Sequence, residues 1–575
     1  MQTNFSTKII LALLTLSALA ATAIPYAWTR FNAGDEWRGV VPETSYDAMY
    51  YFARANDVTR GHLFVTSPYF FEHRNTPFHN PTFTDPIVAL PQILGLSFNT
   101  GYYLNIFLWA LIFLVLLYAF FRAHVIPPVI GFLGALWCYV GLYGDMLRPG
   151  VMQVIYPLYI FFLLFFLRYI NKKESSVLPL AIVTGITAYF YIFLFMVVAA
   201  TLGIYFMVVL LRRDWAEFRR ICLTGVIAVA VALPHIARIF YFSLQDFYKE
   251  SLMRQDLFYS HWPQIEAYYY GRWVVLVLLL GYLLRRYIPE KVSGTTHFFV
   301  MMSGAGILLA MVSNIFTGQD FNIATHIGRF GIMWYLAVGV FMLVPVYEFL
   351  VQRKGEWPKR GFIGLLFLLL IYQMFANITR AIPRFSEMKE QAVGVQTYAG
   401  VLDWLGNAPE GVVVAPNDLN SYIPTLTKQY VLYNRHGAYF LLSDDEYQER
   451  FLLYHALDKL TFDDFIGSTV NFGLGPTELA KTSMLQHRLC LFFRAEEDCL
   501  PARSERSFLD MATLKKKFDT LYPSLIQNID KEYAKYHVSY IILKVGESHP
   551  MLETPSCPIV YQDQWFEVCE ITQRP

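Results

Sequence analysis

The stretch VLPLAIVTGITAYFYIFLFMVVAATLGIYFMVVLL, from Val177 to Leu211, carries no charged side chain. As one continuous helix it would be about 50 Å long, because an α-helix rises about 1.5 Å per residue. The hydrocarbon core of a bilayer is only about 30 Å thick. The stretch therefore predicts two membrane spans that meet at Tyr189–Tyr191, and with them a polytopic α-helical membrane protein.

Similar apolar runs on both sides of this stretch bring the prediction to about eleven spans, since a span needs about 20 mostly apolar residues. The predicted spans are Ile9–Pro25, Gly101–Phe121, Ile126–Tyr143, Gly150–Tyr169, Val177–Ala188, Ile192–Leu211, Ile221–Tyr241, Trp273–Leu284, Phe298–Phe316, Phe330–Val351 and Gly361–Ile382. The segment Pro86–Leu96 is too short to span, so it predicts a surface-lying or re-entrant helix.

Charge divides the chain into two parts near residue 383. Charged residues make up 16% of the chain, against about 25% in a typical globular protein. Of the 91 charged side chains, 44 lie in residues 383–575. We therefore expect a membrane domain over 1–382, a linker over 383–397 and a water-soluble domain over 398–575. The net charge of +1 and the lack of a basic face argue against nucleic acid as a partner.

Lysine and arginine in short loops predict the orientation, because such loops stay in the cytoplasm. With a cytoplasmic N-terminus, every strongly basic loop falls on the inner side. These loops contain Arg122; Arg168, Lys172 and Lys173; Arg212, Arg213, Arg219 and Arg220; Arg285, Arg286 and Lys291; and Arg353, Lys354, Lys359 and Arg360. An odd number of spans then places the C-terminal domain outside the plasma or inner membrane. The first span predicts an uncleaved anchor, with a signal peptide cleaved near Ala21–Ala23 as the alternative.

The cysteines agree with an external C-terminal domain, where disulfides are permitted. Cys557 and Cys569 lie symmetrically about Asp563 in a predicted hairpin, and Cys490 and Cys499 would close a small loop. Both pairs are disulfide candidates, and zinc is not expected because no CxxC spacing is present.

A long outer loop, from about residue 28 to 86, follows the first span and is too long for a simple connector. On a helix from Ser45, Asp47, Tyr50, Tyr51 and Arg54 would share one face. An acid fixed by an arginine at the membrane surface is suited to act as a general base on an acceptor hydroxyl. A surface helix with a simple ion pair explains the same spacing.

A second candidate segment, NIFTGQDFNIATHIGRFGIMW, separates two late spans and contains His326 and Arg329. A cation there is suited to hold the phosphate of a lipid carrier, because arginine presents a planar fork to phosphate oxygens. The alternative is an arginine that only extends to the interface. Arg148, in DMLRPG, and Arg272 are outer cations with the same two interpretations.

The C-terminal part alternates short strands and helices, which predicts an α/β domain. Expected helices include VLDWLGN and SDDEYQERFLLYHAL, and expected strands include GVVVAP, QYVLYN, VSYIILKV and a final hairpin. No nucleotide-binding glycine pattern, nucleophile elbow or metal cluster is found. We expect an accessory domain that shields or selects the acceptor.

These features together resemble the polytopic glycosyltransferases of the C-type (GT-C) superfold. YDAMYYFARANDVTRGHLFVTSPYFFEH (residues 46–73) resembles the Asp- and Tyr-rich first loop of poorly characterised members. GITAYFYIFLF and TGQDFNIATHIGRF resemble their pinched pair of spans and late His/Arg loop. The resemblance implies transfer of a hexosyl or pentosyl group, with inversion, from a polyprenyl-phosphate carrier to an acceptor glycan, lipid or protein at the outer face. It matches Asp47 to the loop acid, with Asp35 and Glu36 as rival positions.

The chain also departs from that pattern. No WWDYG-type motif is present, which argues against an oligosaccharyltransferase catalytic subunit. The loop acids do not form an Asp-X-Asp arrangement, so no cofactor is firmly implied, although Mg²⁺ or Mn²⁺ is compatible with the resemblance. Two other functions stay open. One is a non-catalytic assembly protein of the cell envelope with a GT-C shape, and the other is a transporter of lipid-linked saccharides, which would need ionisable residues near the bilayer midplane.

Overall fold

The computed structural model describes residues 2–43, 47–63, 66–76, 78, 83–123, 126–148, 150–171, 174–255, 258–259, 261–290, 292–354, 356–381, 385–456, 460–467, 511–547 and 557–572.

Each predicted apolar run coincides with a helix of the structure. These helices are α1 (Gln2–Ala33), α4 (Phe98–Ala123), α5 (Pro128–Gly141), α7 (Met152–Ile170), α8 (Val177–Phe190), α9 (Ile192–Leu211), α10 (Trp215–Ser243), α12 (Ile265–Tyr287), α13 (Gly294–Met311), α15 (Ile323–Lys354) and α16 (Glu356–Ala381). Within the described residues, eight helices are long and apolar enough to cross a membrane, and shorter apolar helices occupy 128–141, 177–190 and 367–376. The chain is therefore a multi-pass membrane protein.

The break predicted at Tyr189–Tyr191 is confirmed. Tyr191 separates α8 from α9 and has an extended backbone, with φ −164° and ψ 116°. A β-region residue between two helices ends one and allows the next to begin in a new direction. The break therefore divides the long apolar stretch as its length requires.

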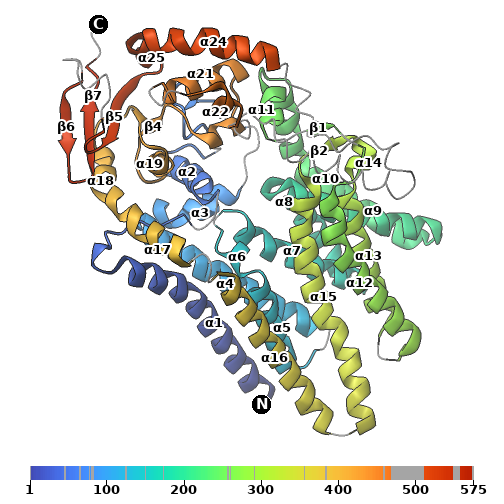
Figure 1. Ribbon diagram of the computed structural model, residues 1–575. Helices are drawn as coiled ribbons and strands as arrows, with labels where there is room; N and C mark the ends of the chain where they lie inside the picture. The colour runs from blue at the N-terminus through green and yellow to red at the C-terminus, as the bar shows by residue number, and fades with distance from the viewer. Residues whose placement is uncertain are drawn as a thin grey trace, which may run out of the picture.

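Shorter elements lie in the connections between the apolar helices. They are η1 (Gly34–Glu36), α2 (Ala48–Thr59), η2 (Phe71–His73), α3 (Thr84–Ile93), α6 (Tyr143–Met146), η3 (Glu174–Ser176), α11 (Tyr248–Arg254) and α14 (Asn314–Thr317). Strand β1 (Phe258–Tyr259) pairs antiparallel with β2 (Gln319–Asp320), and so joins two of the connections. Figure 1 shows α2 and α3 between the membrane helices and the C-terminal domain. The short helix predicted at Pro86–Leu96 corresponds to α3.

The C-terminal domain has the mixed α/β fold expected from the sequence. Its helices are α17 (Phe385–Gly394), η5 (Val395–Tyr398), α18 (Ala399–Asn407), α19 (Asn417–Asn420), α20 (Ile423–Leu426), η6 (Arg435–Tyr439), α21 (Asp444–Tyr454), α22 (Phe462–Gly467), α24 (Met511–Gln527) and α25 (Ile529–Lys535). Its strands are β3 (Val412–Val414), β4 (Tyr430–Val431), β5 (Val538–Lys544), β6 (Ile559–Gln562) and β7 (Phe566–Glu570). They form a sheet in the order β4-β3-β5-β7-β6. The first three strands are parallel, and β7 and β6 pair antiparallel.

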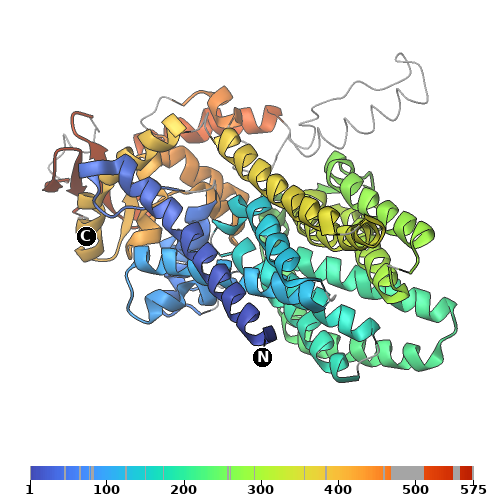
Figure 2. The same cartoon turned by 90° about the horizontal axis from the view of Figure 1, so that it is seen from below.

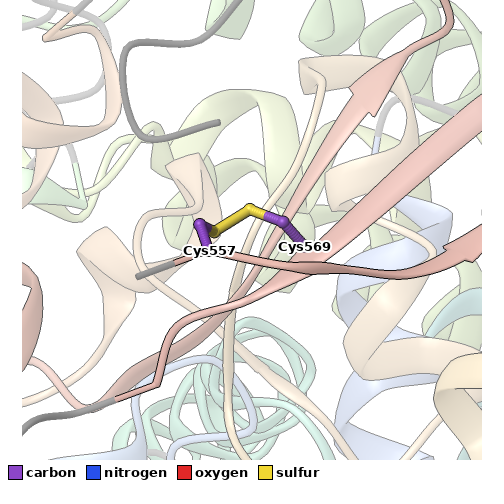
Figure 3. The surroundings of a disulfide bond; sticks show 2 residues. All are labelled: Cys557 and Cys569. Atoms are coloured by element: carbon purple, nitrogen blue, oxygen red, sulfur yellow. A yellow bond between two sulfur atoms is a disulfide. The ribbon is translucent and has the colours of Figure 1, made fainter. Parts of the chain in front are cut away.

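The predicted disulfide between Cys557 and Cys569 is present, with Cα atoms 5.2 Å apart. Figure 3 shows the bond linking the start of the β6–β7 hairpin to its return strand. The second predicted pair, Cys490 and Cys499, lies outside the described residues.

The first outer loop and the C-terminal domain share one hydrophobic core, separate from the core of the membrane helices. Buried loop residues such as Phe52 and Phe70 belong to the same core as Val412 and Phe451. The backbone N–H of Val431 in the edge strand β4 donates to the Tyr69 carbonyl at 2.8 Å. The two parts of the chain therefore lie on the same side of the membrane helices (Figures 1 and 2).

Helix α11 lies against the C-terminal domain. The buried Arg254 donates to the carbonyl oxygens of Ala438, Phe440 and Leu442 and pairs with Asp444. Three backbone acceptors and one carboxylate satisfy most of a guanidinium's donors. The segment that precedes α12 is thereby attached to the C-terminal domain.

Candidate functional site

Asp47 stands at the amino end of α2, where its carboxylate is available for a tertiary contact. It occupies the N-cap position with φ −123° and ψ 12°, and its side chain makes no capping hydrogen bond. The carboxylate instead forms an ion pair with Arg148, and the two side chains are 20% and 13% exposed. The acid predicted from the loop sequence is thus paired with an outer arginine from another part of the chain.

Arg148 is positioned by the turn that follows α6. Its backbone N–H donates to the Asp145 carbonyl at 3.1 Å. Gly150, two residues on, has φ +78°, and a Cβ there would lie 3.0 Å from the Tyr51 side chain. Glycine adopts this positive φ without strain, and its lack of a side chain leaves room for Tyr51. The Arg148 guanidinium then lies 5.6 Å from the Tyr51 ring centroid.

His326 and Arg329 lie in the first turns of α15, whose start is fixed against α12. The buried Gln264 accepts a hydrogen bond from the Ala324 backbone at 3.0 Å. A Cβ on Gly328 would lie 2.4 Å from the Tyr270 side chain, so the two helices approach closely where that glycine stands. This contact directs the neighbouring Arg329 away from α12.

His326 is held by the residue at the helix break. Its Nδ1 lies 2.6 Å from the Tyr191 hydroxyl, and its ring stacks on Phe193 with centroids 4.3 Å apart. The break between α8 and α9 thus places a phenol beside the imidazole. The Nε2 atom remains the ring nitrogen that could meet a ligand.

Arg329 makes no hydrogen bond or ion pair within the described part of the chain. The groups whose charges act on it are Tyr191, Asp145, Tyr156 and Tyr51. Burial lowers the pKa of Arg148 to about 10, and the positive charge of Arg329 is the next largest cause. The structure therefore brings Arg329 and Arg148 together, and Asp47 with them.

We call this group the arginine cluster: Asp47, Arg148, His326 and Arg329, together with the flanking Tyr51, Asp145, Tyr156 and Tyr191. The Tyr156 hydroxyl donates to Asp145, the flanking acid, at 2.6 Å. Two guanidinium groups beside one another repel unless an anion lies between or near them. Asp47 already supplies an anion for Arg148, so Arg329, for which the described residues supply no ion pair, is the cation of the cluster best suited to an anionic ligand.

Tyr50 and Arg54 are part of the support beneath the cluster. Arg54 is buried and pairs with Asp85 of α3 at 2.5 Å, and it also donates to the Tyr50 hydroxyl at 3.0 Å. We expected Arg54 to fix Asp47 along one helical face. The structure gives that place to Arg148, because α2 begins at Ala48 and Asp47 is outside its helical repeat.

Three other candidates lie apart from these contacts. Arg272 is exposed on α12, and its guanidinium is 5.3 Å from the Trp273 ring centroid, with Tyr268 and Tyr269 nearby. Asp35 and Glu36 are exposed in η1 at the end of α1. Their substrate-binding and catalytic roles stay predictions.

Several residues of the site carried little signal in the sequence. Asp145 lies in the same DMLRPG segment as Arg148, but the sequence did not single it out. Tyr191 was predicted only as part of the break between two spans, not as a residue of the site. Glu43, just before the helix, gave no signal. Its carboxylate lies 3.9 Å from Arg435 of the C-terminal domain. Only tertiary structure brings these residues together.

No group of three or more His, Cys, Asp or Glu side chains that could hold a metal occurs among the residues that the structure describes. The compatibility with Mg²⁺ or Mn²⁺ stays a prediction, and we derive no step through a metal.

Comparison with known proteins gives a distant structural match. No family model matches the sequence, and no curated protein does. The chain is similar to the crystal structure of ArnT from Cupriavidus metallidurans bound to undecaprenyl phosphate. The TM-score is 0.42 at 12% identity, and the match covers 97% of this chain and 98% of that one. The apo structure of the same ArnT gives a TM-score of 0.40 at 12% identity, covering 96% and 97%.

Proposed function

We propose that the protein is an inverting glycosyltransferase. It moves a hexosyl or pentosyl group from a polyprenyl-phosphate-linked donor to an acceptor at the outer face of the membrane. The observation that carries this proposal is the arginine cluster. It combines an arginine without a described partner, a second arginine and a histidine at the outer ends of membrane helices.

The cations serve the phosphate of the lipid-linked donor. Arg329 offers its donors to phosphate oxygens in two directions, which suits a planar guanidinium. His326 is oriented by Tyr191, so its free ring nitrogen is the second candidate contact. As the bond to the sugar breaks, negative charge grows on the phosphate, and preorganised cations stabilise that charge most strongly away from bulk water.

The reaction needs one proton acceptor and one leaving group. An acceptor oxygen forms a bond to the anomeric carbon, and its proton passes to a carboxylate at the amino end of α2. The bond between the anomeric carbon and the phosphate oxygen breaks, and its electron pair leaves with the polyprenyl phosphate. Asp47 is the carboxylate that the resemblance assigns, and its ion pair also fixes Arg148 near the phosphate.

The test is the binding of polyprenyl phosphate to the purified full chain in detergent, followed by native mass spectrometry. A charge-assisted hydrogen bond contributes about 1.5–3 kcal/mol. We therefore expect Arg329→Gln to bind about 10- to 100-fold more weakly than the wild type. Arg38→Gln, at an exposed arginine outside the arginine cluster, serves as the matched control.

The sugar and the acceptor follow from a second measurement. Mass spectrometry of envelope glycans and lipid-linked sugars is compared between wild-type cells and cells that lack the gene. The missing product identifies both groups. If the wild-type protein does not bind polyprenyl phosphate and deletion changes no glycan, the proposed function is wrong.

A further inference from the structure

A second carboxylate, Glu43, stands beside the amino end of α2, on the side that faces the C-terminal domain. Its backbone N–H donates to the Tyr422 hydroxyl at 3.0 Å, which holds this part of the loop against the domain. A backbone hydrogen bond from Met49, in the first turn of α2, reaches its carboxylate. Glu43 and Asp47 therefore flank the same helix end.

Arg435 of η6 is the charged partner that the structure gives Glu43. Its Nη2 lies 3.9 Å from Oε1, and that oxygen has no hydrogen-bond partner among the described residues. The Glu43 and Arg435 side chains are 20% and 33% exposed, whereas Oε1 itself is buried, and the 3.9 Å separation makes the contact a loose one. The buried pairs of the same loop differ: Arg54 and Asp85 are 4% and 0% exposed.

Helix η6 connects Glu43 to the arginine cluster. Tyr439, at its end, packs on Tyr50 with ring centroids 5.1 Å apart, and it acts electrostatically on Arg148. His436 also packs on Tyr50, with ring centroids 5.3 Å apart, and lies 5.9 Å from the Tyr439 ring. A Cβ on Gly437 would lie 2.2 Å from the Phe70 ring, so η6 is pressed against the first loop at this point.

The two carboxylates have different surroundings. Asp47 is paired directly with Arg148. Burial raises the pKa of Glu43 to about 7, against the opposing effects of the Arg435 charge and the hydrogen bond from Met49. A base works best when its pKa lies near the working pH. When two acids have such different environments, one can serve as the proton acceptor while the other has a different role.

We propose that Glu43 is the residue that takes the proton from the acceptor hydroxyl, with Arg435 and Tyr439 of η6 holding that acceptor beside it. This inference rests on the proposed glycosyl transfer. The acceptor oxygen forms the new bond to the anomeric carbon as its proton moves to the Glu43 carboxylate. The polyprenyl phosphate leaves toward Arg329, and Asp47 acts as a positioning residue that fixes Arg148.

The C-terminal domain then takes part in the site. Arg435, which lies near Glu43, and Tyr439, which packs on Tyr50, both come from η6. The donor and acceptor sides of the site thus come from different parts of the chain. The domain selects the acceptor through these residues.

The experiment compares cells that carry Glu43→Gln, Glu43→Asp or the control Glu410→Gln, which changes an exposed glutamate. The readout is the product that is present in the wild type and absent after deletion of the gene. Each variant is also purified, and its binding of polyprenyl phosphate and its thermal unfolding are measured. Glutamine retains an acceptor for the Met49 N–H. If the role of Glu43 were purely structural, Glu43→Gln would therefore still form product.

We expect Glu43→Gln to form product about 100-fold more slowly or worse, since general-base catalysis contributes at least about that factor. Its binding of polyprenyl phosphate and its unfolding temperature should match those of the wild type. Glu43→Asp should recover part of the rate. In wild-type membranes the rate should rise as the pH increases through about 7, because the base must be unprotonated. The groups that face Glu43 are Arg435, with the adjacent His436, and Tyr422.

Each other result has a definite meaning. Normal product formation by Glu43→Gln would overturn the role of Glu43 and leave the proposed function intact. Loss of product together with a lowered unfolding temperature in both Glu43 variants would show a structural role instead. Failure of the wild-type protein to bind polyprenyl phosphate, with no product lost on deletion, would contradict glycosyl transfer itself.

Discussion

Two arginines near the amino end of α2 have opposite surroundings, and this difference defines their roles. Arg54 is buried with Asp85, and both side chains are almost fully enclosed. Arg148 pairs with Asp47, and both side chains remain partly exposed to ligand. Removing one member of a buried pair leaves an uncompensated charge in the interior, whereas a partly exposed partner can be solvated. We therefore predict a structural role for Arg54 and a role in the site for Arg148.

This difference predicts opposite effects of the same substitution. Arg54→Met should lower the free energy of unfolding by about 3–5 kcal/mol, the usual cost of breaking a buried pair. Arg148→Met should change it by less than about 2 kcal/mol, because water reaches Asp47. It should instead weaken the binding of polyprenyl phosphate. Thermal unfolding and native mass spectrometry on the same detergent preparations measure the two effects. Equal destabilisation by both substitutions would contradict the assignment.

At the scale of elements, η2 and α21 are joined by an ionic network. The buried Arg450 pairs with Glu72 of η2 at 2.6 Å and with Glu446 of α21 at 2.9 Å. His73 lies 2.9 Å from the same Glu446 carboxylate. The Arg450 guanidinium also lies 4.5 Å from the Phe70 ring centroid. Ser443 caps α21, since its hydroxyl accepts from the Glu446 N–H at 3.0 Å. The Glu446 side chain is then available for the network.

From this network we predict that acid weakens the attachment of the first loop to the C-terminal domain. Burial acts to raise the pKa of Glu446, but the His73 hydrogen bond and the Arg450 charge outweigh it and lower the pKa to about 2. A lowered folded-state pKa gives stability that is present above the unfolded value of 4.5 and is lost as the pH falls toward 2. The loss should amount to roughly 3 kcal/mol at most.

Thermal unfolding of the detergent-solubilised protein between pH 6 and pH 2, the range that spans both values, measures this effect. Glu446→Gln should lower stability at pH 6 and flatten the decline with acid. Asp445→Asn is the control, because Asp445 lies on the same helix as Glu446 and its side chain is 88% exposed in its ion pair with Lys517 of α24. If the stability of Glu446→Gln fell with acid as steeply as that of the wild type, the acid sensitivity would come from other groups.

At the scale of the whole molecule, the sequence predicted the parts that depend on local composition. The spans and the break at Tyr191 follow from apolar length, and the hairpin disulfide follows from the spacing of Cys557 and Cys569. The partners within the site were not predictable in this way. Asp47 meets Arg148, and Glu43 meets Arg435, across long separations in the chain. Periodicity and spacing report only on neighbours along a helix or strand, so they suggested Arg54 as the partner of Asp47.

The shared core makes the first loop and the C-terminal domain one folding unit on the outer side of the membrane helices. Loop residues Phe52, Tyr69 and Phe70 are almost fully buried in this core. A chain that ends at residue 394 would expose these aromatic side chains and leave Glu72 and Asn56 without their partners in the domain. Burial of one large apolar side chain contributes about 1.5–3 kcal/mol, so several lost at once exceed the stability of an ordinary domain.

We therefore expect the chain truncated after residue 394 to insert into the membrane but to fold incorrectly in the outer loop. Trypsin added from the outer side should cleave it at Arg54 and Arg60, which the C-terminal domain protects in the full chain through contacts such as that of Arg60 with Tyr430. Mass spectrometry of the fragments measures the cleavage, and intact inner loops show that insertion succeeded. An uncleaved loop in the truncated chain would mean that the loop folds without the domain. The site at the loop would then form without the C-terminal domain, and η6 would only add the proposed acceptor-binding residues to it.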